Sequence, residues 1–223
     1  LKYYEKAFAN EALHDAFINS MIVASISTLV STVLGAMLGI LLYRFRFPLK
    51  GAYEGMVHLP IVIPEVCMGV ALLAFFAAIK MPLGLTTITV SHIAFTIPFV
   101  AVVIRARMAG FDRSLEEAAC DLGAGQWQVM RDITLPYLKP GLIAGAMLAF
   151  TLSLDDFVIT FFTSGPGSTT FPIKIYSMVR FSVTPEVNAA STLLIVLTLG
   201  LTVVAMWVQS RGDGGAGARK EGA

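Results

Sequence analysis

Three carboxylates interrupt long apolar stretches of the sequence and are the side chains best suited to bind a charged molecule: Glu65, Asp155 and Asp156. An ionisable group inside a membrane span costs about 2.5 to 3.5 kcal/mol on insertion scales, so such a group marks a transport path or an ion pair. No lysine or arginine falls at a matching depth in these stretches. We therefore predict that a cationic cargo, a partner subunit or cavity water satisfies these carboxylates, and we take all three as candidate residues of a substrate pathway.

The local sequence assigns these carboxylates different roles. Asp155 and Asp156 are adjacent, so on a helix their side chains point about 100° apart. One of them is expected to line the path while the other caps backbone or faces a partner. Glu65 follows Pro60 and Pro64, which break the helix pattern, and amides freed near a half-helix N-terminus would attract a carboxylate for structural reasons.

Other reactive residue types carry no recognisable chemistry. His58 and His92 lie near the ends of apolar stretches, and we interpret them as interfacial or hydrogen-bonded residues rather than ligands. Cys67 and Cys120 have neither disulfide-framework nor metal-ligand spacing. The sequence contains no HExxH, CxxC, GxSxG or GxxxxGK[ST] motif. We therefore expect no catalytic residue, no metal site and no cofactor in this chain, and if ATP drives the protein, another chain binds it.

The longest polar interval, 116–136, is predicted to form two short helices joined by a tight turn. Ser114 and Glu117 have the spacing of a capping box, in which each side chain would bond the other's backbone amide. Gly123 stands where a left-handed residue would end the first helix. One apolar face of that helix contains Leu115, Ala118, Ala119 and Leu122.

The second part of this interval is an amphipathic segment, 126–134, and Pro136 is predicted to stop it. Trp127 lies on its apolar side, and we expect that it anchors the loop to the membrane face. Small residues in an exposed helix allow close approach by another backbone, so a soluble partner could bind the two-helix segment 116–136, which we call the elbow.

The composition decides the class of protein. Hydrophobic residues make up 56% of the 223 residues and charged residues 14%, and the mean hydropathy is +0.75. Soluble domains carry about 25% charged residues, so the sequence predicts an all-α, polytopic transmembrane helical bundle in a lipid bilayer. The basic residues fall in short loops without a platform of aromatic residues, which argues against nucleic-acid binding.

Five apolar stretches have the length of membrane spans, about 20 residues. They are 16–43, 56–79, 86–104, 140–162 and a last span that begins at the cap pattern Thr184-Pro185-Glu186 and ends at Val208. In the first span a G-x-x-x-G pair, Gly35 and Gly39, could admit a neighbouring helix. Pro140 would start the fourth span, in the first turn, where proline is favoured.

The distribution of lysine and arginine predicts the orientation. Eleven of the sixteen fall in one set of loops, 44–50, 105–139 and 211–220, which we therefore place in the cytoplasm. The predicted domains are an extracytoplasmic segment at 1–15, a transmembrane domain at 16–208 with a cytoplasmic loop at 105–139 and an external loop at 164–187, and a flexible cytoplasmic tail at 209–223.

The elbow residues resemble a known family. Glu117-Ala118-Ala119, then Gly123 and Ile133-Thr134-Leu135-Pro136, match at every fixed position the EAA loop of permeases of bacterial type I ABC importers. In that family the loop forms a cytoplasmic coupling helix that docks into a groove on the ATPase. The resemblance implies that the coupling residues are Glu117, Ala118, Ala119, Leu122, Gly123 and Pro136.

Further runs, 150–159, 164–167, 174–180 and 184–189, look like permeases of the spermidine/putrescine importer branch. This resemblance implies the type I permease fold in the bacterial inner membrane and transport by alternating access. It also implies a heterodimer with a second homologous permease, two ATPase subunits that hold ATP-Mg, and a periplasmic polyamine-binding protein. Permeases of this family usually have six spans with both ends inside, so a further span is expected before Leu1.

Other functions stay open at this point. The same type of permease could carry another cationic amine, thiamine or a metal chelate, and substrate competition would separate these cargoes. A cation channel would also use carboxylates in its spans, but a passive pore does not need a loop that docks on an ATPase. A membrane-embedded enzyme would need a nucleophile or a metal cluster, and the sequence shows neither.

Overall fold

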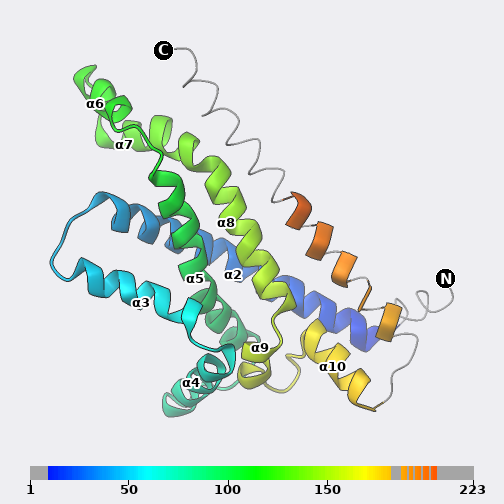
Figure 1. The fold of residues 1–223 in the computed structure, drawn as a ribbon. Coiled ribbons are helices and arrows are strands. Elements are labelled where there is room, and N and C mark those ends of the chain that lie inside the picture. Colours follow the sequence, from blue (N-terminus) through cyan, green and yellow to red (C-terminus); the bar gives the residue numbers. More distant parts are fainter. Residues whose placement is uncertain are drawn as a thin grey trace.

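The computed structural model describes residues 10–181 and, further along, 187–189, 191–192, 194–196, 198–200 and 202–204. Residues 1–9, the cap pattern at 184–186 and the predicted tail at 209–223 lie outside the described residues. Within the described part every regular element is helical, and the all-α prediction is confirmed (Figure 1). The elements are α2 (Glu11–Arg44), α3 (Lys50–Val62), α4 (Glu65–Ala78), α5 (Leu85–Met108), α6 (Ser114–Asp121), α7 (Gln126–Val129), the π-helical turn η1 (Met130–Thr134), α8 (Leu135–Asp155), α9 (Val158–Thr163) and α10 (Phe171–Phe181).

Four helical stretches of the described chain are long and apolar enough to cross a membrane, and a bent pair makes up to five. They are α2, α5, the continuous stretch Gln126–Asp155 and Val187–Val204, and the bent pair is α3 with α4. The first predicted span is confirmed, but its helix begins at Glu11. The side chain of Asn10 caps it by accepting the amide of Leu13 at 3.2 Å. The end of the predicted external segment is therefore helical.

The second span is broken at Pro64, as predicted, but not at Pro60. α3 and α4 meet at an angle of 107°, and the extended residues Ile63 and Pro64 form the corner. Pro64 directly precedes α4, a position from which no amide is needed for a hydrogen bond within the helix. Pro60 lies inside α3 and does not break it. The break places Glu65 in the first turn of α4.

The predicted bounds of the fourth span, 140–162, are wrong at both ends. α8 starts at Leu135, continues through Pro140 and ends at Asp155, and Pro136 does not stop the preceding segment. The π-helical turn explains the continuation, because the amide of Leu135 bonds the carbonyl of Met130 five residues back. The widened turn leads into α8 with Pro136 in its first turn, where a helix tolerates proline.

Two glycines of α2 permit a close helix contact in the bundle centre. A Cβ atom on Gly35 would lie 2.7 Å from Cβ of Val100, and one on Gly39 would lie 2.7 Å from the carbonyl oxygen of Ala101. Both neighbours belong to α5, so the approach predicted from the G-x-x-x-G pair is confirmed. α8 packs on the same two helices and completes a central group of three.

Replacing Gly39 with valine is expected to destabilise the bundle by about 1 to 3 kcal/mol, since the new side chain must displace the backbone of α5. Thermal unfolding of the purified protein in detergent measures the effect. Gly55→Val is the matched control, because Gly55 is also helical and a Cβ there meets no atom within 4 Å. Equal melting temperatures for the two variants would contradict the packing argument.

The bundle has two chemically distinct ends. α6 and α7 lie at one extremity in Figure 1, and α4, α9 and α10 lie toward the other. Near the α6 end, Glu54 of α3 accepts from Arg105 at 2.9 Å and lies 3.9 Å from Lys50. Toward the other end, Asn19 of α2 donates to the carbonyl of Thr169 at 3.0 Å. The structure thus brings the loops at 44–50 and 105–139 to one end, as the charge count predicted.

Candidate functional site

A break between α8 and α9 separates the two adjacent aspartates. α8 ends at Asp155, whose side chain is exposed, and the next residue, Asp156, has extended backbone angles and is only 8% exposed. The carboxylate of Asp156 accepts from the amides of Ile159 (3.3 Å) and Thr160 (2.8 Å) and from the hydroxyl of Thr160 (2.7 Å). Asp156 therefore caps α9, the capping role expected for one of the two aspartates.

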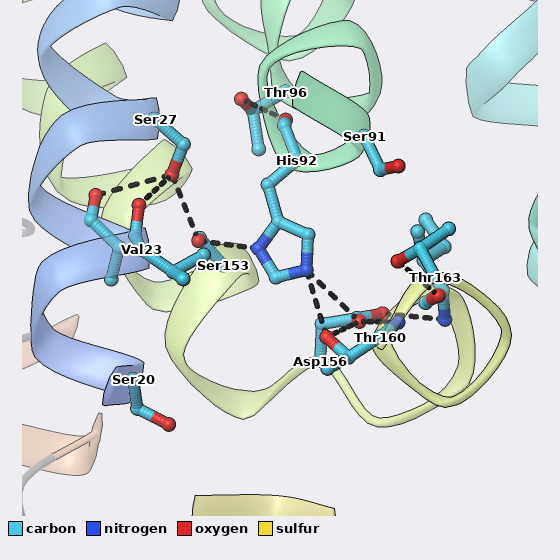
Figure 2. Close-up of polar contacts among 12 residues, drawn as sticks. Ser20, Val23, Ser27, Ser91, His92, Thr96, Ser153, Asp156, Thr160 and Thr163 are labelled. Atoms are coloured by element: carbon cyan, nitrogen blue, oxygen red, sulfur yellow. Dashed lines mark hydrogen bonds and ion pairs between the residues drawn. The ribbon is translucent and has the colours of Figure 1, made fainter. Parts of the chain in front are cut away.

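His92 of α5 completes a buried polar cluster around this cap (Figure 2). Its Nε2 atom lies 2.9 Å from the hydroxyl of Thr160 and 3.2 Å from Oδ2 of Asp156, while Nδ1 lies 2.7 Å from the hydroxyl of Ser153 in α8. Ser153 in turn lies 3.0 Å from the hydroxyl of Ser27 in α2. The cluster joins four helices, and His92 is 1% exposed.

This cluster corrects one expectation and confirms another. The prediction that the carboxylates lack a partner within the chain is wrong for Asp156, because a histidine lies beside it. The interpretation of His92 as a hydrogen-bonded residue is confirmed, although it is buried and not interfacial. Its role could not be found from local sequence, since its partners are 61 and 68 residues away along the chain.

Asp155 and Glu65 form a second, exposed arrangement. Glu65 lies in the first turn of α4, and α4 packs against α9, the helix that follows the break after Asp155. Both side chains are exposed, and within the described part of the chain no ion pair involves either of them. Two neighbouring unpaired negative charges attract a cation.

The α6–α7 hairpin ends its first helix as predicted. Gly123 has φ +90°, its amide donates to Cys120 O at 2.8 Å, and the amide of Ala124 donates to Ala119 O at 3.0 Å. These two bonds form a Schellman motif. A Cβ on Gly123 would meet no atom within 4 Å, so the glycine serves the backbone angle.

The predicted capping box at the start of this helix is wrong. The amide of Ser114 donates to Oδ1 of Asp112 at 2.9 Å, and Ser114 is itself the first helical residue. Asp112 outcompetes the serine because it lies two residues before the helix, where a carboxylate reaches the first free amide. The hydrogen bonds from the Ser114 amide and hydroxyl hold the pKa of Asp112 below its usual value.

The hairpin is uncovered by the rest of the described chain. α6 has no buried residue, and Glu117 and Ala118 are both exposed. Leu122 is 90% exposed and Trp127 is 72% exposed. Most of the predicted apolar face, Leu115, Ala118 and Leu122, is thus exposed and available to another protein or to the membrane surface, while Ala119 is half-buried.

A polar junction fixes the base of the hairpin. Glu116 of α6 accepts from Arg44 at the end of α2 and from the hydroxyl of Thr134 in η1. Arg44 also donates to the Thr134 hydroxyl at 3.1 Å, and Thr134 is fully buried. A hollow of about 310 Å³ beside the junction is lined by Arg44, Phe45, Met108, Phe111, Arg113, Glu116 and Glu117. The sequence pattern singled out Glu117 and missed Glu116.

Comparison with known proteins shows the family to which this chain is related. Residues 31–213 match the family described as the inner membrane component of binding-protein-dependent transport systems. The chain belongs to this family. It is therefore a permease subunit of an inner-membrane transporter and is not an enzyme, because the ATPase of such a transporter is a separate chain.

The permease resembles characterised relatives along most of its length. It is 39% identical to the spermidine/putrescine transport system permease protein PotC of Haemophilus influenzae, over 95% of this chain and 82% of that protein. It is 38% identical to the putrescine transport system permease protein PotI of Escherichia coli K12, over 95% of this chain and 78% of that protein. A bacterial alginate ABC transporter, solved in complex with alginate pentasaccharide-bound periplasmic protein, has the same fold, with a TM-score of 0.72 and 18% identity over 92% of this chain and 81% of that chain.

The base of the hairpin yields a prediction for this permease. Replacing Arg44 with methionine leaves the carboxylate of Glu116 largely buried without its cation, which costs about 1 to 3 kcal/mol and is expected to accelerate amide exchange across 114–129 about tenfold or more. Hydrogen–deuterium exchange measures this rate. Arg131→Met is the matched control, because Arg131 pairs with Asp132 on the exposed surface. Equal exchange rates in the two variants would show that the junction does not hold the hairpin.

Proposed function

We propose that this permease carries polyamines such as spermidine and putrescine, and that Asp155 and Glu65 meet the cationic cargo. The observation that carries the proposal is the presence of two exposed carboxylates on adjoining elements, neither of which has an ion-pair partner in the described chain. A molecule with two or more ammonium groups complements such a pair. The relatives PotC and PotI support this choice, since their names state spermidine or putrescine transport.

The proposed assembly contains a second homologous permease, two ATPase subunits that bind ATP-Mg, and a periplasmic polyamine-binding protein. The hairpin residues Glu117, Ala118, Ala119, Leu122 and Gly123 dock on the ATPase, and the C-terminus lies in the cytoplasm. Pro136, which the sequence pattern included with them, lies in the first turn of α8. The external loop at 164–187 is the proposed dock for the binding protein.

The proposed mechanism is alternating access. Closure of the ATPase dimer on ATP moves the hairpin, and the junction of Glu116, Arg44 and Thr134 passes that movement to α2 and α8. α2 carries α5 with it through the close contact at its glycines. The bundle thereby exposes the carboxylates of Asp155 and Glu65 to one side of the membrane and then to the other.

Uptake of labelled spermidine and putrescine into proteoliposomes that contain the complete transporter tests the proposal. ATP-dependent accumulation that unlabelled polyamines suppress is the expected result. ATP hydrolysis stimulated by the binding protein without polyamine uptake would overturn the cargo and favour another cationic amine, thiamine or a metal chelate. Flux that persists without ATP would instead indicate a cation channel.

A further inference from the structure

The imidazole of His92 spans the break between α8 and α9. One ring nitrogen contacts Ser153 in the last turn of α8, and the other contacts Asp156 in the break and Thr160 in α9 (Figure 2). Asp155 lies between these two attachment points and is exposed, while Leu154 and Asp156 on either side are buried. A single rigid ring therefore contacts both sides of the break that follows the exposed carboxylate.

The hydrogen-bond contacts show how His92 makes this bridge. The hydroxyl of Ser153 lies 2.7 Å from Nδ1 of His92 and 3.0 Å from the hydroxyl of Ser27, which donates to the carbonyl of Val23 at 2.6 Å. On the other side the hydroxyl of Thr160 donates to Asp156, and both oxygens lie within reach of Nε2. Each ring nitrogen of His92 therefore has its own set of partners, one set in α2 and α8 and the other at the start of α9.

The same contacts separate the roles of the two aspartates. Nε2 of His92 lies 3.2 Å from Asp156, whose other bonds come from amides and a hydroxyl of α9. The carboxylate of Asp156 thus has its partners within the chain, whereas the carboxylate of Asp155 has no ion-pair partner in the described part and is the one available to the cargo.

We propose that His92 is a positioning residue for transport: by bridging α8 and α9 through Ser153 and Asp156, it holds Asp155 at the place where the cation binds. The inference rests on the proposed function, because it takes Asp155 as the cargo-facing group. Without the bridge, the two residues at the break can rotate about their backbone bonds, and the ordering of Asp155 must then be supplied by the cargo.

Transport kinetics of the complete transporter test this role. His92→Gln replaces the ring that contacts both helices, and Ser153→Ala removes its contact on α8 together with the contact between Ser153 and Ser27. Each is expected to raise the half-saturating spermidine concentration about tenfold, the size expected for the loss of one buried hydrogen bond, with the maximal rate changed less than about twofold. Ser91→Ala is the matched control, because Ser91 is also buried but bonds only the carbonyl of Thr87 in its own helix.

A double-mutant cycle shows whether His92 acts through Asp155. In the Asp155→Asn background, His92→Gln is expected to raise the half-saturating concentration by less than about twofold, since there is no charge left to position. Equal effects of His92→Gln in both backgrounds, or an unchanged half-saturating concentration in assembled His92→Gln and Ser153→Ala transporters, would overturn the proposal.

A labelling experiment decides the inference independently of the cargo. In a background of Cys67→Ser and Cys120→Ser, Asp155→Cys in nanodiscs reacts with a cationic methanethiosulfonate, and His92→Gln or Ser153→Ala is expected to change that rate about fivefold or more. Asp121→Cys on the exposed hairpin is the control and keeps its rate. An unchanged rate at Asp155→Cys refutes the positioning role, whereas failure of polyamine uptake in the unmodified transporter refutes the proposed cargo and leaves this readout intact.

Discussion

Uptake is expected to fall about a hundredfold or more when Glu117 is replaced by lysine, because reversal of a charge in a docking surface places like charges together and costs several kcal/mol. Glu117 lies in the first turn of α6 and is exposed, whereas its neighbour Glu116 is turned toward Arg44. The variant therefore changes the docking surface and leaves the junction at the base of the hairpin intact. Uptake and binding-protein-stimulated ATP hydrolysis in proteoliposomes are the measurements.

Two controls make the Glu117→Lys result specific. Asp132→Lys reverses an exposed charge in the same hairpin region, where the carboxylate is already paired with Arg131, and its effect should be below about tenfold. The fold of the variant is checked by its melting temperature, which is expected to equal that of the unmodified protein since α6 has no buried residue. Normal uptake by Glu117→Lys would remove the hairpin from the coupling mechanism.

The sequence predicted those features of the hairpin that depend on local backbone chemistry. The left-handed Gly123 is one, because a positive φ strongly favours glycine. The helix start was mispredicted because Asp112 and Ser114 are both competent caps, and local pattern cannot rank two adjacent candidates. The contact of Glu116 with Arg44 joins residues 72 positions apart, so no local pattern contains it.

The membrane part divides in the same way. The spans around α2 and α5 follow from uninterrupted apolar runs, and the corner before Glu65 follows from Pro64. The break after Asp155 was missed because the apolar run continues into α9 and contains no proline. Its signal is the spacing of Asp156 and Thr160, in which a carboxylate precedes a helix and bonds a residue four positions on. That spacing alone does not predict the break, and the contact with His92, far away in the sequence, is also needed to stabilise the cap.

Asp155→Asn is expected to raise the half-saturating polyamine concentration about tenfold to a hundredfold, and Glu65→Gln should act in the same direction. Opposite charges at about 4 Å interact by about 4 kcal/mol near a protein surface, and water in the path reduces this value. Asp155→Asn should not lower the melting temperature, because the side chain of Asp155 is exposed and has no ion-pair partner in the described chain. Initial uptake rates over a range of spermidine concentrations, with thermal unfolding of the same preparations, are the measurements.

Asp156→Asn is the matched comparison, since it makes the same chemical change one residue further along. The carboxylate of Asp156 is bonded by two amides, the hydroxyl of Thr160 and His92, so its loss leaves buried donors poorly satisfied and should lower the free energy of unfolding by about 3 to 5 kcal/mol. A raised half-saturating concentration without loss of stability therefore identifies a group that meets the cargo, and a loss of stability identifies one that shapes the site. Unchanged uptake kinetics for Asp155→Asn would exclude Asp155 from the path, and unchanged stability for Asp156→Asn would contradict the buried cluster around His92.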